Sequence, residues 1–180
     1  KLFVAEIKEN GQMNTENISG KLPGSATWSP DGNQIVSESL EFPDKQNPLE
    51  AINRIFIADV NGLTVEEPRE AFSFSEMVSE TRMKWSPNQK SFAFGMRRLG
   101  TGGIMITGTD GSDPRFLVAG EDPSWSPDGT KIAFGGGSMR WGLVFNDIGI
   151  INTDKSGKRM LDLIDFNPQK PSWSPDGKKI

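Results

Sequence analysis

The pentapeptide Trp-Ser-Pro-Asp-Gly occurs three times in this 180-residue chain, at 28–32, 125–129 and 173–177, and Trp-Ser-Pro-Asn-Gln at 85–89 is a near copy. An apolar residue follows each Trp by seven positions: Ile35, Phe92, Ile132 and Ile180. The gaps between successive motif Trp residues are 57, 40 and 48 positions. Because the copies keep one register, the sequence predicts a structural unit built several times, and periods of this length are typical of propeller blades.

The third copy shows most clearly what one unit contains. Residues 123–126 and 131–134 have strand-like composition, and the Pro127-Asp128-Gly129 run between them has turn chemistry. Pro presets its own backbone angle, Asp hydrogen-bonds the backbone ahead of it, and Gly accepts a left-handed conformation. We therefore expect a tight hairpin of two strands, called A and B, at each copy of the motif.

Two further strands, C and D, are predicted after each hairpin. Candidates for strand C are 55–58, 104–107 and 148–151, and candidates for strand D are 63–65, 115–118 and 159–162. The chain begins in the same order, with 2–7 as strand C and 16–19 as strand D, and it ends within a strand B at Ile180. The predicted fold is all-β: a β-propeller of four-stranded antiparallel blades, with about four blade-equivalents over 1–180, as part of a propeller of about six to eight blades.

Composition argues against several classes of function. The net charge is −4, whereas a nucleic-acid-binding surface is expected to be basic. No run of about 18 apolar residues is present, so no membrane span is expected. The chain contains neither His nor Cys, which removes the commonest general base, the commonest zinc ligand and every Ser-His-Asp triad within it. We therefore expect no catalytic residue, metal or cofactor.

The segments 123–134 and 171–180 resemble the PD40, or WD40-like, repeat of TolB-type propellers, and 150–157 resembles the C strand and turn of that repeat. The resemblance extends over essentially the whole chain. It implies a propeller that is often periplasmic or secreted in bacteria, in a family that also includes the propeller domains of prolyl-oligopeptidase-like and tricorn-like peptidases. The second copy departs from the pattern because Asn88 and Gln89 replace Asp and Gly.

The motif residues are assigned structural roles. Each Trp is expected to pack between blades rather than to form a stacking platform for sugars or bases. Each motif Asp is expected to hold a turn rather than to bind calcium, because the acidic turns lack the ligand pattern of an EF-hand. The Gly-rich runs at 100–103 and 135–137 lack the Lys-Ser/Thr of a phosphate-binding loop. The motif residues to which we assign these structural roles are Trp28, Asp31, Trp85, Trp125, Asp128, Trp173 and Asp176.

Insertions and aromatic residues outside the motif point to one face of the predicted disc. Two repeats are stretched between strands B and C, at 38–53 and 138–146, and the expected D–A loop at 71–77 lies on the same face. Loops on a rigid scaffold commonly carry function, and Trp with Arg is typical of interface hot spots. The alternative is that these loops only cover the blade tops or an adjacent domain. The candidates for a binding face are Trp141, Arg140, Phe145, Phe72, Phe74, Arg97 and Arg98.

The predicted function is a non-catalytic propeller scaffold that binds a protein or peptide, or a glycan, beside further blades or another domain of the parent chain. The resemblance implies a periplasmic or secreted location. The alternative is the substrate-gating propeller domain of a larger enzyme, such as a prolyl-oligopeptidase-like serine peptidase, with its catalytic residues on another domain.

Overall fold

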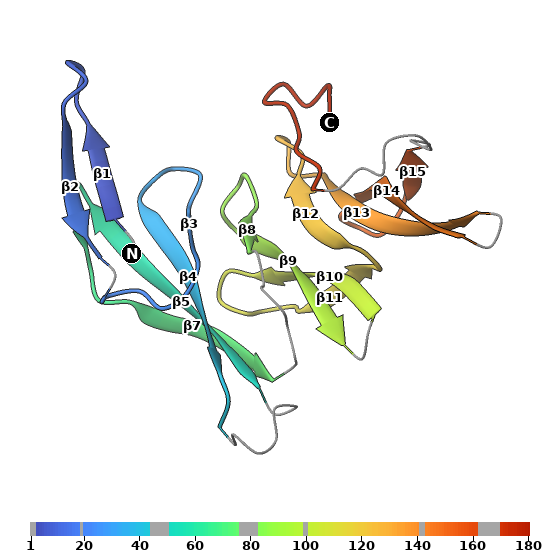
Figure 1. The fold of residues 1–180 in the computed structure, drawn as a ribbon, viewed down its shortest axis with the longest axis horizontal. Coiled ribbons are helices and arrows are strands. Elements are labelled where there is room, and N and C mark those ends of the chain that lie inside the picture. Colours follow the sequence, from blue (N-terminus) through green and yellow to red (C-terminus); the bar gives the residue numbers. More distant parts are fainter. Residues whose placement is uncertain are drawn as a thin grey trace. The chain divides into compact units, whose positions relative to one another are not determined.

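A computed structural model describes residues 3–18, 20–43, 51–75, 83–98, 101–140, 143–161 and 170–180. Every regular element in these ranges is a β-strand (Figure 1). The described part of the chain therefore contains no helix, and so no helix that could span a membrane. The chain divides into two compact units, Lys1–Glu76 and Met77–Ile180.

The first unit contains two antiparallel sheets. Strands β1 (Phe3–Ile7) and β2 (Met13–Asn17) form a two-stranded sheet. The second sheet has the order β3 (Ala26–Trp28), β4 (Gln34–Glu41), β5 (Ile52–Asn61) and β6 (Thr64–Val65), and β7 (Arg69–Ser75) also pairs with β5. The buried core of this unit consists of Val4, Ile18, Leu22, Ile35, Ala58, Val60 and Val65.

The second unit contains two four-stranded antiparallel sheets. The strands of one are β8 (Lys84–Trp85), β9 (Ser91–Arg98), β10 (Thr101–Gly108) and β11 (Arg115–Val118). Those of the other are β12 (Glu121–Trp125), β13 (Lys131–Arg140), β14 (Leu143–Asn152) and β15 (Arg159–Leu161). Both sheets have the order A-B-C-D that the repeat predicts.

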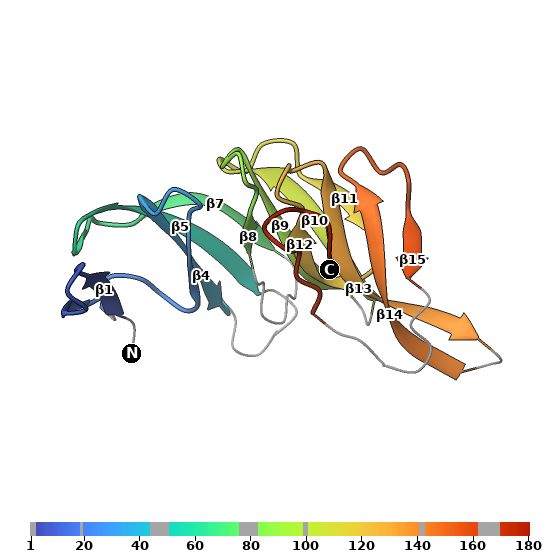
Figure 2. The ribbon, with the colours of Figure 1, turned by 90° about the horizontal axis from the view of Figure 1, so that it is seen from above.

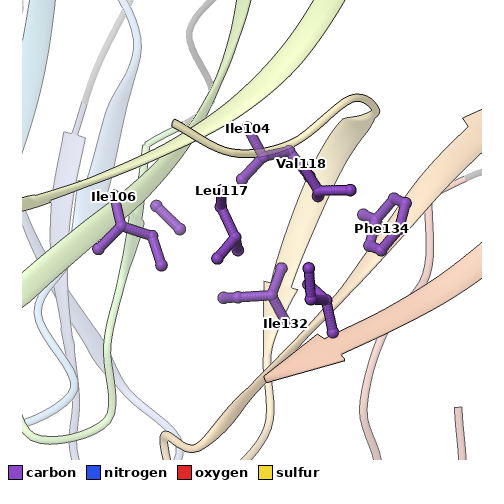
Figure 3. Close-up of a cluster of buried hydrophobic side chains, with 8 residues drawn as sticks. Ile104, Ile106, Leu117, Val118, Ile132 and Phe134 are labelled. Atoms are coloured by element: carbon purple, nitrogen blue, oxygen red, sulfur yellow. The ribbon is translucent and has the colours of Figure 1, made fainter. Parts of the chain in front are cut away.

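The core of the second unit is shared between its two sheets. Leu117 and Val118 of one sheet and Ile132 and Phe134 of the other lie in one buried cluster (Figure 3). Since each sheet contributes part of this cluster, the two sheets pack face to face, as neighbouring blades do.

In both stretched repeats the described parts of the insertions lengthen strands B and C, while residues 44–50 and 141–142 lie outside the described residues. Strands β4 and β5 pair over eight positions, from Gln34–Asp59 to Glu41–Ile52. Strands β13 and β14 pair over ten, and their hairpin extends beyond β12 and β15 (Figures 1 and 2). In the first unit β7 pairs with β5 over the same extension, as far as Ile52.

Three expected strands differ in the structure. Strand β2 covers 13–17 instead of 16–19, because the turn after β1 is tight and brings Met13 opposite Ile7. The expected D strand at 63–65 is only the short β6, and β7 continues along the same edge of β5 after Pro68, which has no N–H for a ladder bond. Residues 171–180 form the motif turn but no assigned strand, since their described backbone pairs only around that turn.

Candidate functional site

The repeated motif builds the same hydrogen-bonded turn in every copy. In the third copy the Ser126 hydroxyl donates to Asp128 Oδ1 at 2.6 Å and accepts from the Lys131 N–H at 2.9 Å. The same Asp128 oxygen accepts from the Thr130 N–H at 3.0 Å. Ser and Asp of the motif therefore tie the turn to the start of strand B, which explains why these residue types recur at this spacing.

The second copy keeps the turn with altered residues. Asn88 Oδ1 accepts from the Ser86 hydroxyl at 2.8 Å and from the Lys90 N–H at 3.0 Å. Gln89 has a φ of 59°, at the position where Gly32, Gly129 and Gly177 have φ of 75°, 69° and 68°. A side chain in this left-handed region costs about 1–2 kcal/mol, so this copy is strained.

We expect Gln89→Gly to raise the free energy of unfolding by about 0.5–1 kcal/mol, since Gly relieves the backbone strain but adds entropy to the unfolded chain. The reciprocal change, Gly129→Gln, should lower it by about 1 kcal/mol. A Cβ at Gly129 would meet Pro87 Cδ at an ordinary 3.7 Å, so this loss would come from the backbone. Urea unfolding followed by circular dichroism measures both; a Gln89→Gly protein that is less stable than wild type would contradict the prediction.

The turn lowers the pKa of its carboxylate. The Ser126 hydroxyl, followed by the backbone and side chain of Thr130, lowers the pKa of Asp128 to about 2. The pKa values of Asp31 and Asp176 are lowered by the same arrangement, led by Ser29 and Ser174. Each carboxylate is thus held ionised as an acceptor, a structural use of its charge.

Acid should therefore destabilise the fold in a defined window. Because the pKa of Asp128 is lower in the folded than in the unfolded chain, its stabilising contribution is complete above about pH 4 and is lost as the pH falls towards 2. Asp128 is exposed, so we expect only about 0.5–1 kcal/mol from it. Urea midpoints measured from pH 6 to pH 2 should fall less steeply for Asp128→Asn than for wild type; parallel curves would show that this turn is not responsible.

The four motif Trp residues are in different environments. Trp85 is buried and meets Phe92 edge-on at 4.5 Å between ring centroids. Trp125 packs against the core of the second unit, and its Nε1–H donates to the Lys84 carbonyl of the neighbouring sheet at 3.0 Å. Trp173 is half-buried, but 45% of Trp28 is exposed.

Trp28 is the most exposed of the four motif Trp residues, and the expectation that each of them packs between blades stays a prediction. Trp125 is covered by β8, which is the A strand of the preceding sheet. Beside Trp28 lies the β1–β2 sheet, which corresponds to strands C and D only, and the described part of the first unit has no A strand there. Trp28 instead lines a shallow depression with Phe3, Ile18, Ala26, Thr27 and Ile35.

For most of the expected binding-face residues the structure does not describe the side chain. Trp141 lies outside the described residues. The backbones of Arg97 and Arg98 lie at the end of β9, that of Arg140 ends β13 and that of Phe145 is in β14. Their grouping on one face stays a prediction.

Phe72 and Phe74 are described, and they lie on a strand rather than in the expected D–A loop. Both belong to β7, where Phe72 pairs with Ile55 and Phe74 pairs with Asn53 of β5. Their half-buried rings stack, with centroids 6.3 Å apart and planes at 27°. The alternation of residues 70–75, with Phe at every second position, is the strand signal that could have located them.

Leu40 lies on the same face, on the other side of β5. It pairs with Asn53, so Leu40, Asn53 and Phe74 form one row, in which Asn53 is buried, as is the neighbouring Ile55. The exposed apolar side chains are at the end of β4, where Leu40 is 44% exposed and Phe42, just beyond the strand, is 46% exposed. We call this exposed pair, Leu40 and Phe42, the aromatic patch.

The opposite face of the same three strands is charged. Arg54 of β5 donates from Nε to Glu41 of β4 and from Nη1 to Glu70 of β7, both at 2.9 Å. These hydrogen bonds and charges raise the pKa of Arg54. One cation therefore links the three strands on this face.

The described residues hold no group of three His, Cys, Asp or Glu side chains placed to bind a metal. The sheet of β4, β5 and β7 has the buried Asn53 and Ile55 with the half-buried Phe rings on one face and the ion pairs of Arg54 on the other.

Known structures share this architecture. TolB from Acinetobacter baumannii superposes with a TM-score of 0.62 at 19% identity, over 94% of this chain and 39% of that one. The fold is that of a TolB-like β-propeller, present in part. The AtxE2 isopeptidase superposes with a TM-score of 0.58 at 13% identity, over 76% of this chain and 28% of that one. An oligogalacturonate lyase in complex with manganese gives 0.54 at 13% identity, over 77% and 41%.

These identities are low, so the likeness concerns the fold alone. The chain spans well under two thirds of the length of each of these three proteins. No protein-family model matches the sequence, and no curated protein matches it. The function of the chain is therefore argued from its own surface.

Proposed function

We propose that this TolB-like propeller segment is a non-catalytic scaffold that binds a protein or peptide, with a glycan as a further possible class of ligand. The observation that carries the proposal is the aromatic patch, where Leu40 is 44% and Phe42 is 46% exposed at the end of a paired strand. Aromatic side chains held by a sheet bring a large contact area with little loss of conformational freedom on binding.

Selection from a library of random peptides displayed on phage tests this proposal. Peptides selected on the wild-type protein should bind Leu40→Ser/Phe42→Ser at least about tenfold more weakly. Phe116→Ser is the matched control, because Phe116 is 50% exposed in the second unit, much as Phe42 is in the first. Binding that is unchanged in the double variant, or equally weakened by Phe116→Ser, would rule out the aromatic patch as the binding surface.

We further propose that the chain belongs to the bacterial periplasm or to the cell exterior, which rests on the likeness to TolB propellers. Fractionation of the native cells, with an antibody raised against the chain, tests this location. Recovery in the cytoplasmic fraction alone would contradict it.

The second candidate is the substrate-gating propeller domain of a larger enzyme, such as a prolyl-oligopeptidase-like serine peptidase, with its catalytic residues on another domain. It is supported by the fold shared with the AtxE2 isopeptidase, because this chain superposes on 28% of the length of that protein. The coding sequence on both sides of this segment discriminates the two candidates. A Gly-x-Ser-x-Gly elbow followed by Asp and His would favour the enzyme, and further Trp-Ser-Pro-Asp-Gly copies alone would favour the scaffold.

A further inference from the structure

We propose that the free edge of β1 and the depression at Trp28 form one site, which binds a two-stranded hairpin of the repeat type. The partner is a hairpin from a further repeat of the parent chain. It would add strands A and B to the β1–β2 sheet, whose described strands are C and D only. This inference goes beyond the proposed function, because the site uses no residue of the aromatic patch and serves the assembly of a sheet.

The turn between β1 and β2 identifies β1 as a strand C. The Lys8 N–H donates to the carbonyl of Gln12, four residues on, at 2.9 Å. The turns that follow β10 and β14 have the same bond, from Gly108 and from Asn152. Strands β10 and β14 each pair with a strand B on one edge and with a strand D on the other. Among the described strands β1 pairs with β2 alone, so the edge that a strand B would use is free.

The motif turns of successive copies stack on one another in the second unit. A Cβ at Gly129 would meet Pro87 Cδ at 3.7 Å, and one at Gly177 would meet the same atom of Pro127 at 3.6 Å. The motif Gly of one copy thus lies over the motif Pro of the preceding copy. A Cβ at Gly32 would meet no atom within 4 Å. The place beside Gly32 is therefore where the Pro of a further copy would lie.

Trp28 lacks the cover that an added strand A would give. The Trp125 Nε1–H donates to the carbonyl of Lys84, the residue just before the motif Trp of the preceding copy. Trp28 is exposed instead and lines the depression with Phe3, which is 54% exposed. A strand A beside Trp28 would offer the same backbone carbonyl to its indole N–H and would remove this apolar surface from water.

The register specifies what strand B must carry. Counting back two residues from the closing turn places Glu6 level with Ile106 and Ile150. These two residues pair with Ala93 and Ala133 of their strands B, and both Ala side chains are fully buried. The site therefore favours a hairpin with a motif turn and a small residue eight positions after the motif Trp.

The first experiment tests the position of the added strand by disulfide exchange. The probe is a peptide with the sequence of residues 121–134, carrying Phe134→Cys activated as a mixed disulfide. The same register places this Cys opposite Ala5, and the chain has no Cys of its own. We expect the thiol of Ala5→Cys to react at least about tenfold faster than that of Thr15→Cys, because the exposed Thr15 pairs with Ala5 from β2, one strand further from the probe. Equal rates would overturn the proposal.

The second experiment measures fluorescence anisotropy of the labelled peptide with Ser in place of its Cys. We expect saturable binding that Trp28→Ala weakens at least about tenfold and that Trp28→Phe weakens less. A peptide of the same composition in scrambled order is the control. Leu40→Ser/Phe42→Ser should leave binding of this probe unchanged, so the failure of the proposed function and the failure of this inference give different results.

A fused chain decides the question if the free peptide does not bind, since an isolated hairpin is only marginally stable in water. The peptide sequence joined before Lys1 by a short Gly-Ser linker has an effective concentration of about millimolar order. This fusion should have a higher urea midpoint than a fusion with the scrambled sequence, and Trp28→Ala should remove the difference. Equal midpoints would overturn the inference. So would a dimer in sedimentation that Trp28→Ala abolishes, because a second copy of the chain would then occupy the site.

Discussion

Replacing Trp125 with Ala should lower the free energy of unfolding of the second unit by about 3–5 kcal/mol. The side chain packs against the buried cluster that the two sheets share. Its Nε1–H also donates to the Lys84 carbonyl of the neighbouring sheet, a bond worth about 1 kcal/mol. The loss should be large because one truncation removes both packing and a hydrogen bond between the two sheets.

Two controls separate these contributions. Trp125→Phe keeps an aromatic ring but not the donor, so it should lose clearly less than the Ala variant. Trp28→Ala removes the same residue of the same motif where it is 45% exposed, and we expect a loss of at most about 1 kcal/mol. Urea unfolding with circular dichroism measures all three; equal losses at Trp28 and Trp125 would show that blade contacts do not determine the cost.

The contrast between these two Trp residues shows where sequence reasoning was sufficient. The turn after each Trp could be predicted because its hydrogen bonds join residues a few positions apart, as Ser126, Asp128 and Lys131 are. The burial of the Trp could not, because it depends on a strand from another sheet. Trp28 and Trp125 have the same local sequence and differ in what lies beside them.

The candidate site was predictable only in part for a similar reason. Phe72 and Phe74 could be selected as aromatics outside the motif, but the expected loop is a strand, since Pro68 interrupts the edge of β5 without ending it. Leu40 was missed because its place beside Asn53 depends on the register of β4 on β5, which no local pattern specifies. Within the insertion at 38–53, polar and apolar residues alternate only over 39–42, and that short pattern was the available signal for a longer β4.

Glycines inside strands carry a related signal. Gly136 belongs to a run that lacks a phosphate-binding pattern, and the structure places both Gly136 and Gly149 against the ring of Phe134. A Cβ at Gly149 would lie 2.7 Å from Phe134 Cε1, and one at Gly136 would lie 3.2 Å from Cε2. Such glycines mark positions where a large side chain crosses the backbone closely.

Gly149→Ala should therefore cost about 2–3 kcal/mol, because the new methyl group overlaps a ring that is fully buried and cannot move away without strain. Phe134→Ala alone should cost about 3–5 kcal/mol through the cavity that it leaves. The two changes should not add. In the double variant the methyl group introduced by Gly149→Ala occupies space that the ring has vacated, so we expect a coupling of about 1–3 kcal/mol in favour of the pair.

Gly95→Ala is the matched control for this cycle. Gly95 also lies in the middle of a strand, and a Cβ there would meet no atom within 4 Å. Ala at this position should leave the stability unchanged or raise it by up to about 1 kcal/mol, since Gly weakens a strand interior. Urea unfolding of the four proteins of the cycle, with Gly95→Ala beside them, gives the coupling directly. If the losses at 134 and 149 add, the close approach of ring and backbone is not what requires Gly149.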